Sequence, residues 1–243
     1  MKTMNVQKIL LVILIVSCCS GCGTIYRRSP RFDTALPTLK TIAVLPSDVK
    51  VYKLSAGGGS EEMDEWSLTA KTNIEASLKK FLGDGSKYKL ALTFITEDWM
   101  KANQKDLWRR QKAMYEAVVL SVIRHTYSPV ENFPQKIKNF DYTMGPDVGV
   151  LAQALGVDGF IFVNASDTQE TAGHVATSFM RAIVLGYYEV HPSFFCISLV
   201  DGKTGELLWF NVSPGQQNYN FLNPKHIDSI VQWVAKEFIS PKK

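Results

Sequence analysis

The strongest structural signal in this sequence is a pair of β-rich segments near its C-terminal end. Residues 194–200 and 206–212 are rich in aromatic, β-branched and leucine side chains, which favour strands. Between them lies Asp201-Gly202-Lys203-Thr204-Gly205, a short loop with glycine near its end. That arrangement is typical of an antiparallel hairpin with a type I turn and a bulge. The fold must therefore contain a β-sheet.

Further strands are predicted earlier in the chain. Thr41-Ile42-Ala43-Val44-Leu45-Pro46 is an apolar run that proline ends, so we expect a buried strand there. Residues 49–54 alternate between apolar and polar side chains, which predicts a more exposed strand. Residues 88–95 and 157–163 predict two more.

Helical patterns separate these strands. Apolar side chains recur at helical spacing from Trp66 to Phe81, which predicts an amphipathic helix that ends at the glycines after it. Other predicted helices cover residues 97–127, with a break near Asn103, residues 146–156, and the segment that begins at Pro224. Residues 175–188 are apolar almost throughout but too short to span a bilayer, so we expect a buried helix or strand pair.

The alternation of strands and helices predicts the α/β class. We expect a single domain over residues 40–240, with a mixed β-sheet packed by helices, a late β-hairpin and a C-terminal helix. Hydrophobic content of 46% and charged content of 21% are ordinary for such a globule. The formal net charge of +4 includes Lys2 and Lys8, and no basic stripe suggests a nucleic-acid partner.

The first 21 residues have the layout of an export signal. A basic region with Lys2 and Lys8 precedes an unbroken apolar run over residues 9–16, and small residues and cysteines follow. The run is too short for a permanent transmembrane helix, which needs about 20 residues. Ser20-Gly21-Cys22 resembles the lipobox of bacterial lipoproteins, whose cysteine becomes the mature N-terminus and carries acyl chains such as palmitate. Residues 1–21 are therefore predicted to be a lipoprotein signal peptide.

Cys22 is the predicted lipidation site, and Cys18 is the alternative. The two residues before Cys22 fit the lipobox, although Cys19 stands where leucine is usual. The three residues before Cys18 fit throughout, but cleavage there leaves an apolar core near the short end of the usual range. A secreted protein with clustered cysteines and no lipid is the third interpretation. With Cys22 acylated, only Cys196 remains in the mature chain, so no internal disulfide is expected.

Several acyl chains hold a protein on a membrane, because one chain alone anchors it only marginally. Neither candidate cysteine is followed by aspartate, which signals inner-membrane retention in enterobacterial lipoproteins. By this resemblance we expect the outer membrane, with the protein facing the periplasm. Residues 22–39 are polar, with three arginines and two prolines, and predict a flexible tether. Its arginines either are solvated as part of a linker or contact anionic head groups.

Local signatures of catalysis are missing. The four histidines are widely spaced without an H-E-x-x-H pattern, and there is no G-x-S-x-G motif. Gly202-Lys203-Thr204 resembles the end of a P-loop, but a strand pattern follows it where a helix would be needed. No catalytic residue, metal site or cofactor is predicted, and we expect a protein that is not an enzyme. A catalytic triad assembled from residues distant in sequence remains an alternative.

Two loops are candidates for binding a partner, because binding residues concentrate on loops held by a rigid scaffold. One contains Gly57, Gly58 and Gly59 and is followed by Glu61 and Glu62. The other covers residues 128–145 and contains Pro129 and Pro134.

The opening strand Ile-Ala-Val-Leu-Pro and the late hairpin, residues 195–210, also carry a family resemblance. They are similar to a group of mixed α/β bacterial envelope lipoproteins that includes the curli-secretion lipoprotein, penicillin-binding-protein activator lipoproteins and the N-terminal domain of the Tol-Pal propeller protein. The resemblance implies an assembly, transport or regulatory role. We therefore expect a lipid-anchored, non-catalytic component of a cell-envelope complex. The alternatives are an oligomeric secretion pore of the curli type and a periplasmic hydrolase.

Overall fold

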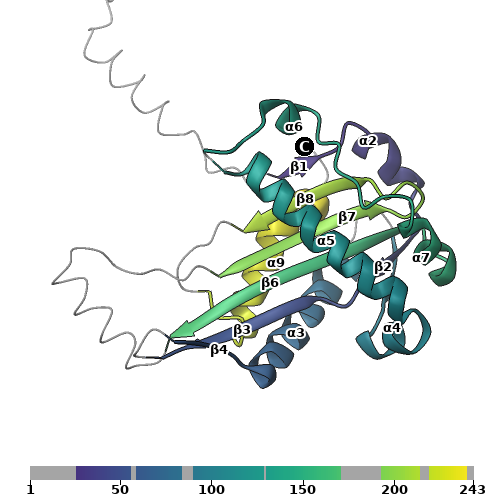
Figure 1. Ribbon diagram of the computed structural model, residues 1–243. Helices are drawn as coiled ribbons and strands as arrows, with labels where there is room; N and C mark the ends of the chain where they lie inside the picture. The colour runs from purple at the N-terminus through teal and green to yellow at the C-terminus, as the bar shows by residue number, and fades with distance from the viewer. Residues whose placement is uncertain are drawn as a thin grey trace, which may run out of the picture.

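A mixed β-sheet with helices on both faces forms the centre of the computed structural model (Figure 1). The structure describes residues 26–55, 59–83, 90–128, 130–170, 193–213 and 219–239. The predicted α/β class and single domain are confirmed. The signal peptide, both candidate lipidation sites Cys22 and Cys18, and the apolar segment 175–188 lie outside the described residues.

Six strands form the main path of the sheet. Their order is β1 (Arg27–Arg28), β8 (Leu207–Ser213), β7 (Phe194–Asp201), β6 (Gly159–Glu170), β2 (Thr41–Val44) and β5 (Ala91–Phe94). The first four strands pair antiparallel, whereas β2 is parallel to both β6 and β5. The predicted hairpin is β7 and β8, with Leu199 opposite Trp209 and a register shift after Leu199.

The long strand β6 is shared by two partners on one of its edges. Its first residues pair with β2, and its second half pairs with β3 (Asp48–Leu54), which is also parallel to it. Strand β4 (Ser60–Glu62) then pairs antiparallel with β3. The predicted strand 157–163 thus covers only the first part of β6, because the second part is rich in polar residues that a sequence pattern assigns to a loop.

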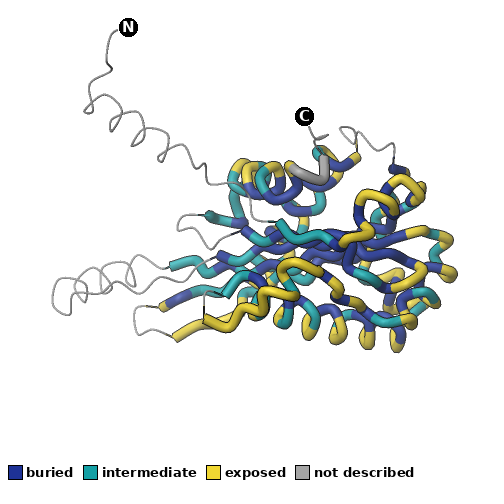
Figure 2. Tube along the Cα trace, turned by 90° about the horizontal axis from the view of Figure 1, so that it is seen from above, coloured by how far each residue is buried: buried dark blue, intermediate teal, exposed yellow. Residues whose placement is uncertain are grey.

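Helices cover both faces of the sheet, and the buried residues lie between them (Figure 2). One face is covered by α3 (Asp64–Leu78), which continues as the π-helical turn η2 (Lys79–Gly83), and by α9 (Pro224–Ile239). The other face is covered by α4 (Glu97–Asn103), α5 (Lys105–Thr126) and α7 (Val148–Leu155). The break predicted near Asn103 is confirmed, because Gln104 leaves helical geometry between α4 and α5. No helix in the described ranges is long and apolar enough to cross a membrane.

The N-terminal segment corrects the prediction of a flexible tether over residues 22–39. From Tyr26 onward the chain is packed on the domain as β1, the short helix α2 (Phe32–Ala35) and the 3-10 turn η1 (Leu36–Thr38). Phe32, Leu36 and Leu39 are buried in the core cluster under α9. The prediction is wrong for residues 26–39. The three apolar side chains have helical spacing, but the arginine and proline residues among them hide this pattern in the sequence.

The loop over residues 128–145 has two unlike halves. Its first half contains the short helix α6 (Pro134–Lys138), which has no buried residue. Its second half is packed into the core through Phe140, Tyr142 and Met144. Thr143 also forms an isolated β-bridge to Glu206 at the start of β8. Only the first half therefore remains an exposed candidate surface.

Candidate functional site

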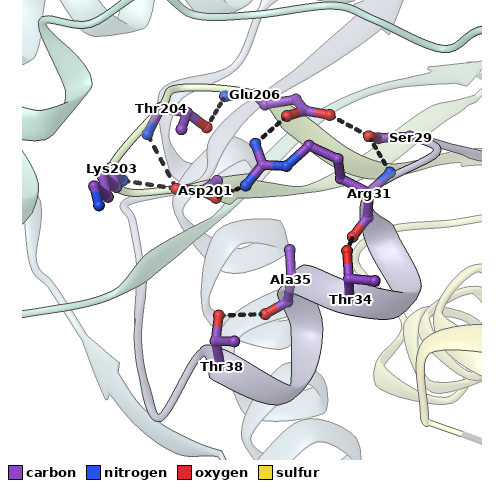
Figure 3. Close-up of polar contacts among 9 residues, drawn as sticks. All are labelled: Ser29, Arg31, Thr34, Ala35, Thr38, Asp201, Lys203, Thr204 and Glu206. Atoms are coloured by element: carbon purple, nitrogen blue, oxygen red, sulfur yellow. Dashed lines mark hydrogen bonds and ion pairs between the residues drawn. The ribbon is translucent and has the colours of Figure 1, made fainter.

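A polar recess lies beside the turn of the β7–β8 hairpin. It has a volume of about 500 Å³ and is lined by the hairpin turn, the N-terminal segment, α7 and the connection from α7 to β6. Its charged lining residues are Arg31, Asp158, Asp201 and Lys203. We call it the hairpin recess, and Figure 3 shows the polar contacts of Arg31 and of the hairpin turn.

The hairpin turn is fixed by its first residue. The Asp201 carboxylate accepts hydrogen bonds from the backbone N–H of Lys203 at 2.8 Å and of Thr204 at 3.0 Å (Figure 3). This is the Asx-type turn that aspartate forms with residues ahead of it. Gly205 closes the turn with φ of 73°, in the left-handed region that favours glycine. Lys203 and Thr204 thus belong to a strand–turn–strand unit, as predicted from the pattern that follows them.

Arg31 joins the N-terminal segment to this hairpin. Its guanidinium lies 2.5 Å from Glu206 Oε2 and 3.6 Å from Asp201 Oδ2 (Figure 3). Ser29 adds two contacts, because its hydroxyl donates to Glu206 and accepts from the backbone N–H of Arg31. Each exposed ion pair contributes at most about 1 kcal/mol, but one arginine that bridges two carboxylates forms a small network.

Asp158 joins the first residues of β2 to the start of β6. Its Oδ2 accepts hydrogen bonds from the backbone N–H groups of Lys40 and Thr41 at 2.8 and 2.9 Å, and from the Thr41 hydroxyl at 3.1 Å. The backbone bonds from Thr41 and then Lys40 lower the pKa of Asp158, because they favour the charged carboxylate. This carboxylate is therefore ionised at neutral pH and engaged by the backbone.

The acidic groups of the hairpin recess are thus held by partners that shape the fold. Asp201 caps the turn, Glu206 binds the N-terminal segment, and Asp158 aligns two strands. Glu206 and Asp158 accept hydrogen bonds from the hydroxyl groups of Ser29 and Thr41, and no histidine takes part in the contacts described above. Among the described residues, no group of three histidine, cysteine, aspartate or glutamate side chains could hold a metal ion.

The other groups with potential chemistry are separate from the recess. Cys196 is buried in β7, and burial raises the pKa of its thiol to about 12. His125 Nδ1 lies 3.1 Å from the Tyr142 hydroxyl, and His226 Nδ1 accepts from the backbone N–H of Asn220 at 3.1 Å. His174 lies outside the described residues, as does His191.

The structure does not bring the predicted partner-binding residues to the recess. Gly57 and Gly58 lie outside the described residues, whereas Gly59, Glu61 and Glu62 are exposed. The last two belong to β4, which pairs with β3 beside the far end of β6. Figure 1 places β4 at the opposite end of the sheet from α7.

Sequence reasoning missed the recess because its parts are distant in the chain. Arg31 was assigned to the predicted tether, although it is 175 residues from its partner Glu206. Asp158 lies in the predicted strand 157–163, and Asp201 lies in the predicted hairpin turn. The one usable signal was Asp201 at the first position of a glycine-containing turn, which favours a side-chain cap of that turn.

The sequence and the fold were compared with those of known proteins. Neither protein-family models nor curated protein sequences match the chain. The PelC dodecamer from Paraburkholderia phytofirmans aligns with a TM-score of 0.34 and 9% identity, over 87% of this chain and 95% of that one. The LpoB C-terminal domain from Salmonella enterica gives 0.28 and 12%, over 76% and 98%. Lipoprotein GNA1162 from Neisseria meningitidis gives 0.30 and 15%, over 82% and 99%.

Proposed function

We propose that this protein is a lipid-anchored, non-catalytic component of a bacterial cell-envelope complex. Acyl chains on Cys22 hold it at the periplasmic face of the outer membrane. The observation that carries this proposal is the packing of Tyr26, which lies only four residues after Cys22, against the core. Because Tyr26 already packs against the core, only residues 23–25 separate the domain from the acylated cysteine.

That spacing sets how far the domain can move from the bilayer. Four peptide units span at most about 14 Å when fully extended. The domain of an anchored molecule is therefore held against the head groups, and it reaches partners in or beside the same membrane. Such confinement raises the effective concentration of any partner there, so weak contacts suffice for assembly.

The polar groups of the hairpin recess support a structural role over turnover. General acid–base chemistry needs a group whose pKa lies near the working pH and that can reach a substrate proton. Asp158 is instead held ionised by backbone donors, and Arg31 is engaged by Asp201 and Glu206. These side chains stabilise the junction between the N-terminal segment and the hairpin.

The anchor is tested by mass spectrometry of the mature N-terminus, together with a Cys22→Ser variant. We expect a diacylglyceryl group on Cys22 and recovery of the protein with outer membranes, and the variant should be released into the periplasm. An acyl group on Cys18 would correct only the site. An unmodified N-terminus would reject the anchored function.

The binding role is tested by in-cell cross-linking. A photo-crosslinking residue at Glu61, exposed on β4, should trap an envelope protein, and the same residue at Thr72, exposed on α3, is the matched control. The cross-link should disappear with Cys22→Ser, because the anchor supplies the effective concentration. Turnover of an envelope substrate by the purified protein, abolished by a single serine, aspartate or histidine substitution, would contradict the non-catalytic assignment.

A further inference from the structure

Three large apolar side chains are exposed close together after the end of α5. Val130 is 88% exposed, Phe133 is 51% exposed and Ile137 is 40% exposed. Single exposed apolar residues are ordinary on protein surfaces, but a cluster marks an interaction site. Phe133 is the N-cap residue of α6 and Ile137 lies one turn later, since the Ile137 N–H donates to the Phe133 carbonyl at 3.1 Å. We call these three residues the apolar patch.

The fold holds this patch in place against α5. The Phe133 N–H donates to the His125 carbonyl at 2.8 Å, and the two rings meet edge to face with centroids 4.6 Å apart. Arg124 forms two hydrogen bonds to Glu131, which fixes the segment between Val130 and Phe133. The three side chains therefore project from a defined surface.

The patch lies beside the point where the packed chain begins. The Arg27 guanidinium donates to the Thr126 carbonyl at the end of α5 and lies 4.5 Å over the Tyr127 ring. Arg27 is five residues after Cys22, so a fully extended chain separates the two Cα atoms by at most about 18 Å. An acyl anchor on Cys22 consequently brings this end of α5 to the membrane.

The charges around the patch are compatible with an anionic surface. Glu131 is paired with Arg124 and Asp141 with Lys136, and each basic group lowers the pKa of its carboxylate partner. Lys138, also exposed, adds a further positive charge. Residues 124–141 thus carry three basic residues, Arg124, Lys136 and Lys138, against two acidic ones, which favours anionic phospholipid head groups.

We propose that the apolar patch inserts into the head-group layer of the membrane that holds the anchor. The inference rests on the proposed acylation, which keeps the patch near the bilayer and makes a weak contact sufficient. Side chains of this kind bury their apolar parts at the boundary between head groups and acyl chains. Figure 1 places α4 at the other end of α5, so docking points α4 away from the membrane.

A spin label reports this insertion directly. Full-length acylated protein is placed in vesicles of phosphatidylethanolamine and phosphatidylglycerol at about three to one, with the label on Val130→Cys or on the control Leu68→Cys. Leu68 is 65% exposed on α3. Cys196 does not compete for the label because it is buried. On adding vesicles, the ratio of oxygen to nickel-chelate accessibility should rise at position 130 and stay unchanged at position 68.

A second pair of proteins separates docking from anchoring. The label is placed on Asn132→Cys, an exposed position inside the patch segment, with and without Phe133→Ser and Ile137→Ser. Both proteins stay on the vesicles through their acyl chains, and circular dichroism checks their folding. The rise in the accessibility ratio should be lost when the two apolar side chains are removed. An unchanged ratio would overturn the proposal.

The remaining outcomes identify what else covers the patch. If the nickel-chelate accessibility of the label at position 130 is the same with and without vesicles, the docking proposal is overturned. Mass spectrometry of the mature N-terminus decides acylation independently. If the protein proves unacylated, the same label in a chain with Cys18, Cys19 and Cys22 replaced by serine still decides, at saturating vesicle concentration, whether the patch inserts. Vesicle-independent dipolar broadening between labels would indicate a second copy of the chain. Shielding only in membranes from cells would indicate a protein partner, and both results overturn the lipid proposal.

Discussion

At the scale of single residues, the hairpin contributes its largest side chain to the core. Trp209 is 2% exposed and packs in the cluster that α9 covers. Trp209→Ala should lower the free energy of unfolding by about 3–5 kcal/mol, as large-to-small core changes do. Urea unfolding measures the loss, with Trp99→Ala, whose side chain is 37% exposed, as control. Equal midpoints for the two variants would show that Trp209 is not a core residue.

Gly205 is a second residue-scale test, because its backbone and its surroundings both require glycine. Its φ is 73°, and an added Cβ would clash with the Gly145 carbonyl. Gly205→Ala should therefore destabilise the fold by more than about 1 kcal/mol. Gly149→Ala in α7 is the control, since a Cβ there meets only ordinary contacts and a helix favours alanine by about 0.5–1 kcal/mol. Thermal unfolding that ranks the two variants in the opposite order would contradict this account of the turn.

At the scale of elements, Asp158 aligns β2 with β6 and makes their junction sensitive to acid. The pKa of Asp158 is lowered in the folded state, so its stabilising contribution is present above the ordinary aspartate pKa of about 3.9. That contribution is lost as pH falls through the lower pKa of the folded state. Asp158→Asn should therefore be less stable than the natural chain at pH 7, and the difference should shrink below about pH 4. Urea midpoints across pH 2–7 test this, and a difference independent of pH would exclude the carboxylate charge as its source.

Elements with a strong local pattern were predictable from the sequence, and the others were not. The break between α4 and α5 and the β7–β8 hairpin follow from side-chain periodicity and turn residues. The second half of β6 is polar, and it becomes a strand because β3 and β7 pair with its two edges. Such pairing depends on distant residues, and so does the ion pair between Arg31 and Glu206 that closes the hairpin recess. Sequence periodicity predicts neither this strand pairing nor this ion pair.

At the scale of the whole molecule, the N-terminal segment decides how the domain would sit on the anchor proposed at Cys22. Strand β1 extends the sheet beside β8, and Arg27 contacts the end of α5. With a packed segment, acylation of Cys22 would hold one end of the molecule at the membrane, whereas a flexible tether would let the domain rotate freely. Orientation at the membrane therefore depends on whether this segment is an integral part of the fold.

The last prediction compares a soluble chain that starts at Tyr26 with one that starts at Lys40, the boundary expected from sequence. The shorter chain loses the buried side chains of Phe32, Leu36 and Leu39. Each such side chain contributes about 1.5–3 kcal/mol when fully buried, and a domain has only about 5–15 kcal/mol of stability in total. We expect the shorter chain to unfold at much lower urea concentration or to aggregate. Phe32→Ala in the longer chain should give an intermediate midpoint, with Thr34→Ala at an exposed position as its control. If both chains unfold at the same urea concentration, residues 26–39 add nothing to the fold, and the anchor no longer orients the domain.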